Sequence, residues 1–275
     1  MVGHHYVVSG LVYQSVFCFD NLFGRVVGMK ILLTNDDGIS AEGIQSLAEK
    51  FSQKHDVVIS APICQQSGMA HALSVHRPIE IMRDKEVESN YSVEAWKIDG
   101  TPTDCVKLYL EALSDEFVPD VVVSGINHGA NLATDVIYSG TVGAAMEGYL
   151  HGIASVAVSL EEESEISFSE VAALMEKYLE EHVKVGGEVF FHNINFPKNF
   201  YAGKAEFVLS KLGRRDYQNA FHKVTENGRV FYRIGGTVWD LDDGEGTDIC
   251  TVKNGRIAVT PLHIDFTDYE ALTER

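Results

Sequence analysis

Short apolar runs and amphipathic segments alternate along the first half of the chain, a pattern that predicts a parallel sheet covered by helices. Unbroken apolar runs, which are typical of strands buried on both faces, occupy residues 31–33, 57–59 and 121–123. Between the first two runs, apolar residues recur at helical spacing, so residues 41–54 are expected to form an amphipathic helix. Strand, helix and strand in this order favour a parallel sheet with right-handed crossovers.

The middle of the chain carries predicted elements of both kinds. Residues 72–98 lack helical periodicity, which predicts a β excursion with its turn at 85–90. Thr101 and Pro102 form a helix-start signal, because threonine suits the N-cap and proline suits the first helical position. That helix is expected to reach about residue 113. Further patterns predict helices at 142–150 and 166–182 and a strand at 153–160.

From about residue 186 the pattern changes to short β-type runs. These runs occupy residues 188–194, 205–210, 229–234, 248–252 and 256–260. Asn-Gly pairs at 227–228 and 254–255 are turn signals, whereas the pattern from 211 to 247 does not determine its elements. The predicted fold is therefore an α/β protein with a Rossmann-like, three-layer parallel-sheet core over about 29–185 and a β-rich appendage over about 186–265.

Residues 1–28 do not fit this organisation. The segment 7–19 is fairly apolar, but no lysine or arginine precedes it, so the charged region of a secretory signal is missing. It is also too short and too often interrupted by polar residues to span a membrane. Met29 stands directly before the first predicted strand. We expect the functional domain to comprise residues 29–275, and residues 1–28 to be a start-site artefact or a poorly ordered tail.

Composition limits the classes of partner and the compartment. The chain has 275 residues, of which 45% are apolar, and a formal net charge of -18. Such a charge argues against stable binding of a nucleic acid polymer, although a bound metal would still permit a small phosphorylated ligand. No Cys-x-x-Cys motif is present, and scattered cysteines are typical of reduced thiols in a cytoplasmic protein. The cysteines are Cys18, Cys64, Cys105 and Cys250.

An adjacent pair of carboxylates, Asp36 and Asp37, follows the first predicted strand. Adjacent carboxylates repel each other, so a divalent cation is the simplest compensation, and an ordinary polar turn is the alternative interpretation. The loops after the second and third strands contribute Ser67 and Asn127, and parallel strands bring such loops to one edge of a sheet. These residues offer only oxygen donors, which suit Mg²⁺, Mn²⁺ or Ca²⁺ and not zinc.

A second candidate feature is the segment Ser139, Gly140 and Thr141 before a predicted helix. Free backbone amides, a glycine that permits close approach and two hydroxyl groups would bind a phosphate, whereas a simple N-cap is the alternative interpretation. Asn131 lies between this segment and the metal loop and is a candidate phosphate donor.

Other polar residues carry weaker predictions. His128 neighbours Asn127 and is a candidate acid or base, although an exposed loop histidine is the more common case. His71 and His76 fall in the β excursion, where core or surface roles are more common than a role in a substrate pocket. The acidic run at 161–163 predicts a solvated approach to a helix.

These stretches together resemble the SurE family, the survival-protein phosphatases that act as 5′/3′-nucleotidases. The similarity covers about 29–160 in order and spacing and continues more weakly to about 265. The matching stretches are Ile31-Leu-Leu-Thr-Asn-Asp-Asp-Gly38, Gln66-Ser67-Gly68, Gly100-Thr-Pro-Thr-Asp-Cys-Val106, Ser124-Gly-Ile-Asn127 with Gly129 and Asn131, Val136-Ile-Tyr-Ser-Gly-Thr-Val142 with Ala144-Ala-Met-Glu-Gly148, and Thr260-Pro-Leu-His263.

The resemblance implies a Rossmann-like domain whose β-rich C-terminal part helps to form dimers or tetramers. It implies one divalent metal ion, with Mg²⁺ or Mn²⁺ expected, and a nucleotide substrate without a membrane partner. The extension before Met29 has no counterpart in the family, and 211–247 follows the family only loosely. The matching metal ligands are Asp36, Asp37, Ser67 and Asn127. The matching phosphate-binding positions are Ser139, Gly140 and Thr141, with Asn131 nearby.

The expected reaction is hydrolysis of a nucleoside 5′- or 3′-monophosphate by metal-activated water, with Asp36 or Asp37 accepting the proton. Direct attack by a carboxylate is the alternative mechanism. No Gly-x-Gly-x-x-Gly follows the first strand, which argues against a nucleotide-cofactor oxidoreductase. A haloacid-dehalogenase-like phosphatase would need Asp-x-Asp there, whereas the aspartates are adjacent. A metal-dependent nucleotide sensor without turnover is the remaining alternative.

Overall fold

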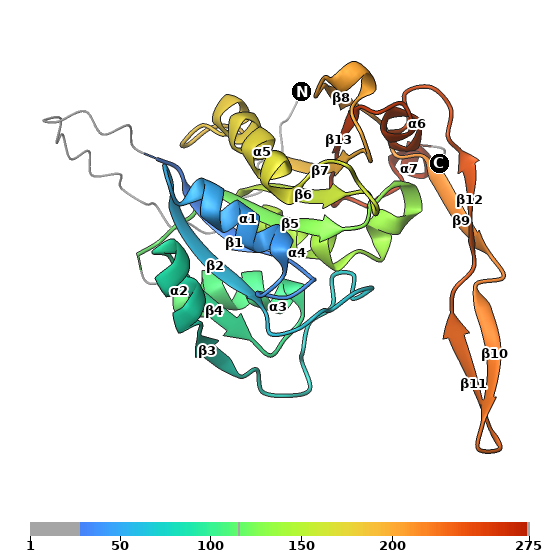
Figure 1. The fold of residues 1–275 in the computed structure, drawn as a ribbon, viewed down its shortest axis with the longest axis horizontal. Helices are drawn as coiled ribbons and strands as arrows, with labels where there is room; N and C mark the ends of the chain where they lie inside the picture. The colour runs from blue at the N-terminus through green and yellow to red at the C-terminus, as the bar shows by residue number, and fades with distance from the viewer. Residues whose placement is uncertain (1–27, 115, 274–275) are drawn as a thin grey trace, which may run out of the picture.

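A sheet of nine strands forms the centre of the protein in this computed structural model, which describes residues 28–114 and 116–273 (Figure 1). The predicted extension at 1–28 lies outside the described residues, apart from Gly28. The strands of this sheet are β1 (Lys30–Thr34), β2 (Asp56–Pro62), β3 (Ile81–Arg83), β4 (Glu94–Ile98), β5 (Val121–His128), β6 (Ala154–Leu160), β7 (Phe191–Phe196), β8 (Phe207–Leu209) and β13 (Ile257–Pro261).

The strand order is β3-β4-β2-β1-β5-β6-β7-β13-β8. All neighbours from β4 to β7 are parallel, whereas β3 at one edge is antiparallel to β4 and β13 is antiparallel to β7. The predicted apolar runs thus lie in the centre of a mostly parallel sheet, where strands are covered on both faces. The α/β fold class is confirmed.

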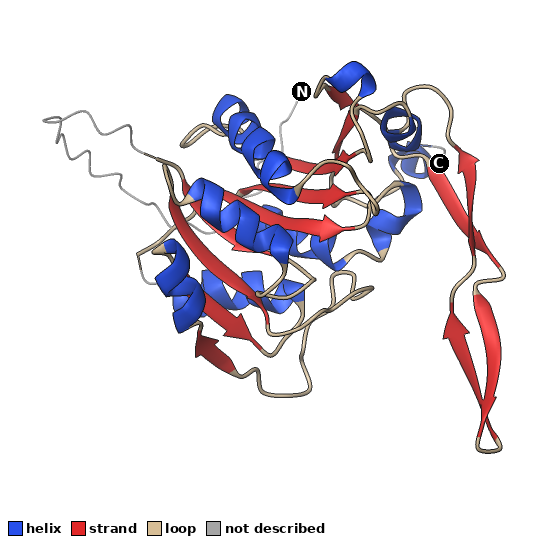
Figure 2. Cartoon of the chain, viewed as in Figure 1, coloured by secondary structure: helices blue, strands red, loops and turns tan. Residues whose placement is uncertain are grey.

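Helices cover both faces of the sheet (Figure 2). The helices of the chain are α1 (Glu42–Phe51), α2 (Lys85–Tyr91), α3 (Pro102–Leu108), α4 (Gly140–Leu150), α5 (Phe168–His182), α6 (Asp248–Lys253) and α7 (Tyr269–Thr273), with a π-helical turn at Tyr109–Leu113 and 3-10 helices η2 (Ala133–Ile137) and η3 (Tyr201–Gly203).

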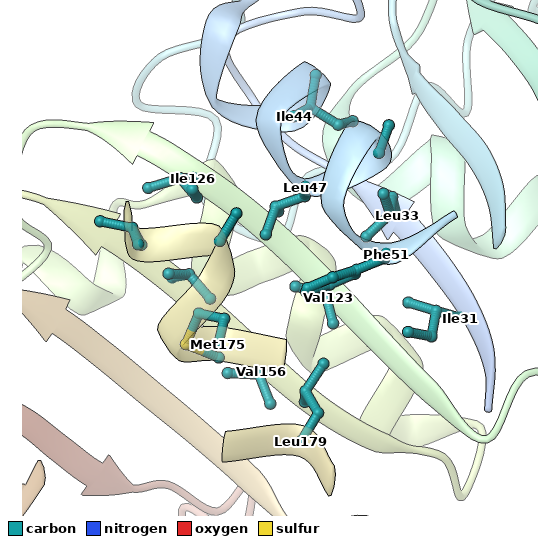
Figure 3. Close-up of a cluster of buried hydrophobic side chains, with 14 of the residues drawn as sticks. Ile31, Leu33, Ile44, Leu47, Phe51, Val123, Ile126, Val156, Met175 and Leu179 are labelled. Carbon is teal, nitrogen blue, oxygen red and sulfur yellow. The ribbon is translucent and has the colours of Figure 1, made fainter. Parts of the chain in front are cut away.

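The period-two alternation of β1 divides its side chains between two hydrophobic layers. Ile31 and Leu33 belong to the layer beneath α1 and α5, where Phe51 and Leu179 meet them (Figure 3). Leu32 points to the opposite layer, beneath α3 and α4. These side chains are fully buried, and each such burial contributes about 2 kcal/mol to stability. The two layers hold β1 rigidly, and β1 in turn fixes the loop that follows it.

The predicted turn at 85–90 is wrong, because these residues form helix α2. The Asp84 carboxylate accepts hydrogen bonds from the backbone N–H groups of Glu86 and Val87 and thereby caps the helix. Val87 is the only buried residue of α2, so the helix has no apolar stripe that periodicity would reveal. The expected start of α3 is confirmed, since Thr101 and Asp104 form a capping box around Pro102, the first residue of the helix.

The predicted strand at 248–252 is also wrong, because these residues form α6. Thr247 caps this helix by accepting a hydrogen bond from the N–H of Cys250. The β-branched residues Ile249, Thr251 and Val252 favour a strand, but the buried positions 248, 249, 251 and 252 have helical spacing. The Asp248 side chain is one of the buried groups, and it accepts hydrogen bonds from Ala133 N–H and Gly213 N–H.

A long β arm projects from the body of the protein (Figure 1). Its base pairs β9 (Arg214–Gln218) with β12 (Thr237–Asp242), and its outer part pairs β10 (Phe221–Glu226) with β11 (Arg229–Ile234). The predicted Asn-Gly turn at 227–228 joins β10 to β11 and is confirmed. The region after 186 also supplies β7, β8 and β13 to the main sheet. Within the described residues, every helix is too short or too polar to cross a bilayer.

Candidate metal centre

The carboxyl ends of β1, β2 and β5 meet at one edge of the sheet and open into a cavity of about 320 Å³. Most of the residues predicted for the site line this cavity, namely Asp36, Asp37, Ser67, Asn127, Asn131 and Ser139. Gly140 and Thr141 lie directly behind it, against Asp36. The three predicted segments therefore converge in the structure. Asn127, however, lies within β5 and not in the loop predicted for it, and it pairs there with Ser159 after an irregularity in the strand.

Asp36 is the buried member of the carboxylate pair, with 5% of its surface exposed. Thr141 Oγ1 donates a hydrogen bond to Asp36 Oδ1 at 2.5 Å, and the Thr141 side chain is fully buried. A Cβ added to Gly140 would lie 3.0 Å from Asp36 Oδ2, so glycine is needed for α4 to approach this closely. Burial raises the pKa of Asp36 to about 6, the Thr141 hydrogen bond opposes this rise, and the charge of Asp37 adds to it.

Asp37 is held at the mouth of the cavity by two elements. The backbone N–H of His128 donates to Asp37 Oδ2 at 3.1 Å, and Gln65 Nε2 lies 3.5 Å from Oδ1. Gly38, with φ of +96°, closes the turn, and its carbonyl accepts a hydrogen bond from Asn35 Nδ2. Among the described residues, no lysine, arginine or histidine side chain forms an ion pair with either carboxylate.

The oxygen donors of Ser67 and Asn127 complete the set. Asn127 Nδ2 donates to the Gly129 carbonyl at 2.7 Å, so Asn127 Oδ1 is the atom of this side chain that could bind a metal ion. Two carboxylates, an amide oxygen and a hydroxyl are hard donors. The negative charge of the carboxylates is not neutralised by a positively charged side chain of any described residue. This donor set fits a divalent cation of the Mg²⁺, Mn²⁺ or Ca²⁺ type.

The residues predicted to bind phosphate have two different orientations: some line the cavity, and one is directed to Asp36. Ser139 caps α4 and lines the cavity, and its Oγ accepts a hydrogen bond from Val142 N–H at 3.1 Å. The predicted alternative, an N-cap, is therefore present as well. The Thr141 hydroxyl is directed to Asp36, so it orients a carboxylate. Asn131 lines the cavity and donates from Nδ2 to Ser159 Oγ at 2.9 Å.

Sequence reasoning missed the residues that hold Asn131. Its backbone N–H donates to Asn195 Oδ1 at 2.8 Å, and its carbonyl accepts from Asn193 Nδ2 at 2.8 Å. Both asparagines lie on β7 and are fully buried. Polar residues at alternate positions of a core strand were an available signal, because buried amides need specific partners.

The histidines predicted from sequence have separate roles. His128 contributes its backbone N–H to Asp37, while its ring lies edge-on to Phe168. His76 is exposed. His71 anchors the loop that carries Ser67: its Nε2 lies 2.7 Å from Glu147 Oε2, and Glu147 Oε1 accepts from Lys107 Nζ at 3.2 Å.

Backbone contacts support the same loop. Ala70 N–H donates to the Tyr138 carbonyl at 3.0 Å, and a Cβ added to Gly143 would lie 2.1 Å from the Ala70 carbonyl oxygen. Glu147 is 3% exposed, whereas the His71 side chain is partly exposed, so this contact ties the loop to a buried carboxylate of α4.

The fold and the site define a class of protein, an α/β protein with a cluster of oxygen donors beside a helix N-terminus at the carboxyl edge of a parallel sheet. A family model described as survival protein SurE matches residues 31–219. The chain belongs to the SurE family.

Several relatives and one solved structure show the extent of this similarity. The 5′-nucleotidase SurE of Heliobacterium modesticaldum is 44% identical over 249 residues, which cover 90% of this chain and 90% of that protein. The 5′-nucleotidase SurE of Caldanaerobacter subterraneus subsp. tengcongensis is 40% identical and covers 88% of this chain and 94% of its own length. The crystal structure of the SurE protein from Aquifex aeolicus is similar with a TM-score of 0.74 at 34% identity, over 88% of this chain and 96% of that chain.

The raised pKa of Asp36 predicts that the metal-free protein is stabilised by Asp36→Asn. Because the pKa is about 6 in the folded chain and near 3.8 without burial, ionisation of Asp36 opposes folding increasingly as the pH rises from about 4, and the effect is complete above about pH 6. The variant should gain up to about 3 kcal/mol in free energy of unfolding at about pH 8, and the gain should vanish below about pH 4. Denaturant titrations in the presence of a chelator measure this difference.

The same experiment with added Mn²⁺ provides the control. The metal should stabilise the unmodified protein, which keeps both carboxylates. With metal present, the unmodified protein should therefore have a higher free energy of unfolding than Asp36→Asn. A metal-free variant that is less stable than the unmodified protein at about pH 8 would contradict the assignment of Asp36 as a strained, desolvated carboxylate.

The contact between His71 and Glu147 predicts that Glu147→Gln weakens metal binding without touching the metal centre. Removal of the charge should loosen the loop that carries Ser67 and reduce Mn²⁺ affinity by about tenfold, as is typical of residues that orient ligands. Glu111→Gln is the matched control, because Glu111 also pairs with Lys107 but does not contact His71. Calorimetric titration of Mn²⁺ compares them, and equal affinities in both variants would refute the role of Glu147.

Proposed function

We propose that this protein hydrolyses nucleoside 5′-monophosphates, and also 3′-monophosphates, to a nucleoside and phosphate. The observation that carries the proposal is the pair Asp36 and Asp37, which faces a cavity beside the N-terminus of α4. In the described part of the chain, no positively charged side chain forms an ion pair with these two carboxylates. The names of the relatives, 5′-nucleotidase SurE, support turnover and disfavour a sensor that only binds nucleotides.

Asp36, Asp37, Ser67 and Asn127 are proposed to hold one divalent ion, Mg²⁺ or Mn²⁺. When bound, such an ion neutralises phosphate charge and lowers the pKa of a bound water. Thr141 and Gly140 prepare the site for it: the first orients the Asp36 carboxylate through its hydroxyl, and the second lets the helix approach.

The N-terminus of α4 is proposed to bind the phosphate of the substrate. The first N–H groups of a helix have no partner within the helix, and they carry partial positive charge. Ser139 Oγ already accepts from Val142 N–H, and the Thr141 N–H is directed to Asp36, so the N–H group of Gly140 and the Ser139 hydroxyl proton remain for phosphate oxygens. Asn131, fixed by Asn193 and Asn195, completes this phosphate-binding group.

The attacking water needs a group to accept its proton. Asp36 and Asp37 both line the cavity, and we propose that one of them, or the two together, accepts the proton. Direct attack on phosphorus by a carboxylate would form a covalent phosphoryl intermediate, so trapping after a rapid quench distinguishes this mechanism from attack by water.

The metal-centre assignment predicts that Asp37→Asn lowers phosphate release from AMP by at least about 100-fold, because a metal ligand and a local charge are lost. EDTA should abolish turnover by the unmodified protein, and Mn²⁺ or Mg²⁺ should restore it. Asp56→Asn is the matched control, since Asp56 is an exposed residue at the opposite end of β2.

Full activity of Asp37→Asn would refute the metal centre. Binding of AMP without release of phosphate from any 5′- or 3′-monophosphate or from polyphosphate would favour the sensor instead. Comparison of AMP with its 3′-isomer in the same assay separates the two proposed substrate types.

A homodimer or homotetramer is proposed on the basis of the β arm. A two-stranded ribbon is marginally stable in water, and this one exposes many large apolar side chains. These side chains include Phe221, Val230, Phe231, Tyr232, Ile234, Val238 and Trp239. A second copy of the chain is the proposed cover. The cytoplasmic location and the absence of a nucleic acid polymer as a stable partner stay predictions.

The proposed assembly predicts that the double variant Phe231→Glu with Ile234→Glu lowers the molar mass in solution. Charges on the arm would have to be buried without partners in a subunit contact, which is unfavourable. Lys223→Glu is the control, because it places a charge on the same arm at a position that is already charged. Light scattering coupled to gel filtration measures the mass, and an unchanged oligomer in the double variant would exclude the arm from the contact.

A further inference from the structure

A second cavity, of about 870 Å³, adjoins the metal centre and is not used by the chemistry proposed above. It lies between η2 and the base of the β arm and is the more apolar of the two. The residues that line both cavities are Gly68, Asp135, Tyr138 and Tyr217. A ligand whose phosphate occupies the metal centre would therefore extend across these residues into the second cavity.

Tyr138 presents an aromatic ring at this boundary. It directly precedes Ser139, the cap of α4, yet 66% of its surface is exposed. Its backbone is fixed on both sides, because its N–H donates to the Asp135 carbonyl and its own carbonyl accepts from Ala70 N–H, each at 3.0 Å. A rigidly held, exposed aromatic side chain beside a polar site is typical of a stacking surface for a ligand.

Tyr217 supplies a second ring from the arm, and polar contacts fix its position. Its hydroxyl donates to Asp135 Oδ1 at 2.9 Å. Arg215 Nη1 pairs with the other oxygen of Asp135 at 3.1 Å, and Arg215 Nε pairs with Asp240 at 2.7 Å. Asp135 thus joins the arm to η2 and places the Tyr217 ring on the wall that both cavities share.

We propose that Tyr138 and Tyr217 form the nucleoside subsite, in which the nucleobase of the substrate stacks on the Tyr138 ring while its phosphate lies at the metal centre. The inference rests on the proposed function and names the part of the substrate that the metal centre does not contact. Every nucleobase has a π-face, so this surface favours substrates whose released nucleoside carries an aromatic base, and it tolerates different bases.

The experiment compares AMP with ribose 5-phosphate, which carries the same phosphate ester and sugar but lacks the base. Tyr138→Ala should lower kcat/KM for AMP by about tenfold, mainly through KM, since one base–aromatic stack is lost. Its kcat/KM for ribose 5-phosphate and its Mn²⁺ affinity should stay unchanged. Tyr138→Phe should behave like the unmodified protein, because the ring remains. Tyr201→Ala, at a tyrosine of similar exposure on η3, is the control.

The outcomes separate this inference from the proposed function. Absence of phosphate release from both substrates by the unmodified protein would refute the proposed function. Equal kcat/KM for AMP and ribose 5-phosphate in the unmodified protein, or parallel losses on both in Tyr138→Ala, would refute the nucleoside subsite alone. Tyr217→Ala is the second variant and should also affect AMP selectively. A change in the molar mass of Tyr138→Ala would assign the ring to a subunit contact and overturn the inference.

Discussion

The burial of the Asp36 carboxylate beside a second carboxylate, Asp37, is the constraint on which the site depends. Two adjacent carboxylates stand at the end of a strand that is buried in both hydrophobic layers, and one of them is almost inaccessible to water. Burial and the neighbouring charge raise the pKa of Asp36, whereas Thr141 offsets part of this effect with one hydrogen bond. The free energy stored in this arrangement favours the binding of a divalent cation, which relieves the repulsion and the desolvation together.

The rest of the core can be understood as the support that keeps this arrangement in place. Strand β1 cannot shift away from the repulsion, because Ile31 and Leu33 pack under α1 and α5 and Leu32 packs on the other side. The close approach of α4 depends on Gly140, and the position of the loop that carries Ser67 depends on His71 and Glu147. Rigid packing thus maintains a site that is unfavourable for folding, as is common where function requires charge in a buried position.

The sequence predicted the central sheet and the metal loops because both depend on local patterns. An unbroken apolar run marks a strand covered on two faces, and Asp36, Ser67 and Asn127 each follow such a run. The errors occur where local patterns are ambiguous. Helix α2 buries a single side chain, and α6 is short and rich in β-branched residues, while its polar Asp248 is buried in hydrogen bonds. The role of Tyr217 depends on its contact with Asp135, which lies more than 80 residues earlier in the chain, so no local sequence pattern could predict it.

Asp135 connects the chemistry to the shape of the whole chain. Its carboxylate accepts from Tyr217 and pairs with Arg215, so the base of the arm is attached to η2, only a few positions before Ser139. The outer part of the arm exposes its apolar side chains and has no core of its own. A subunit that covers the outer arm would therefore restrict the arm at its base as well, and with it the Tyr217 ring on the wall of the metal cavity. The partly buried ion pair between Asp135 and Arg215 would in this way couple the proposed assembly to the geometry of the substrate site.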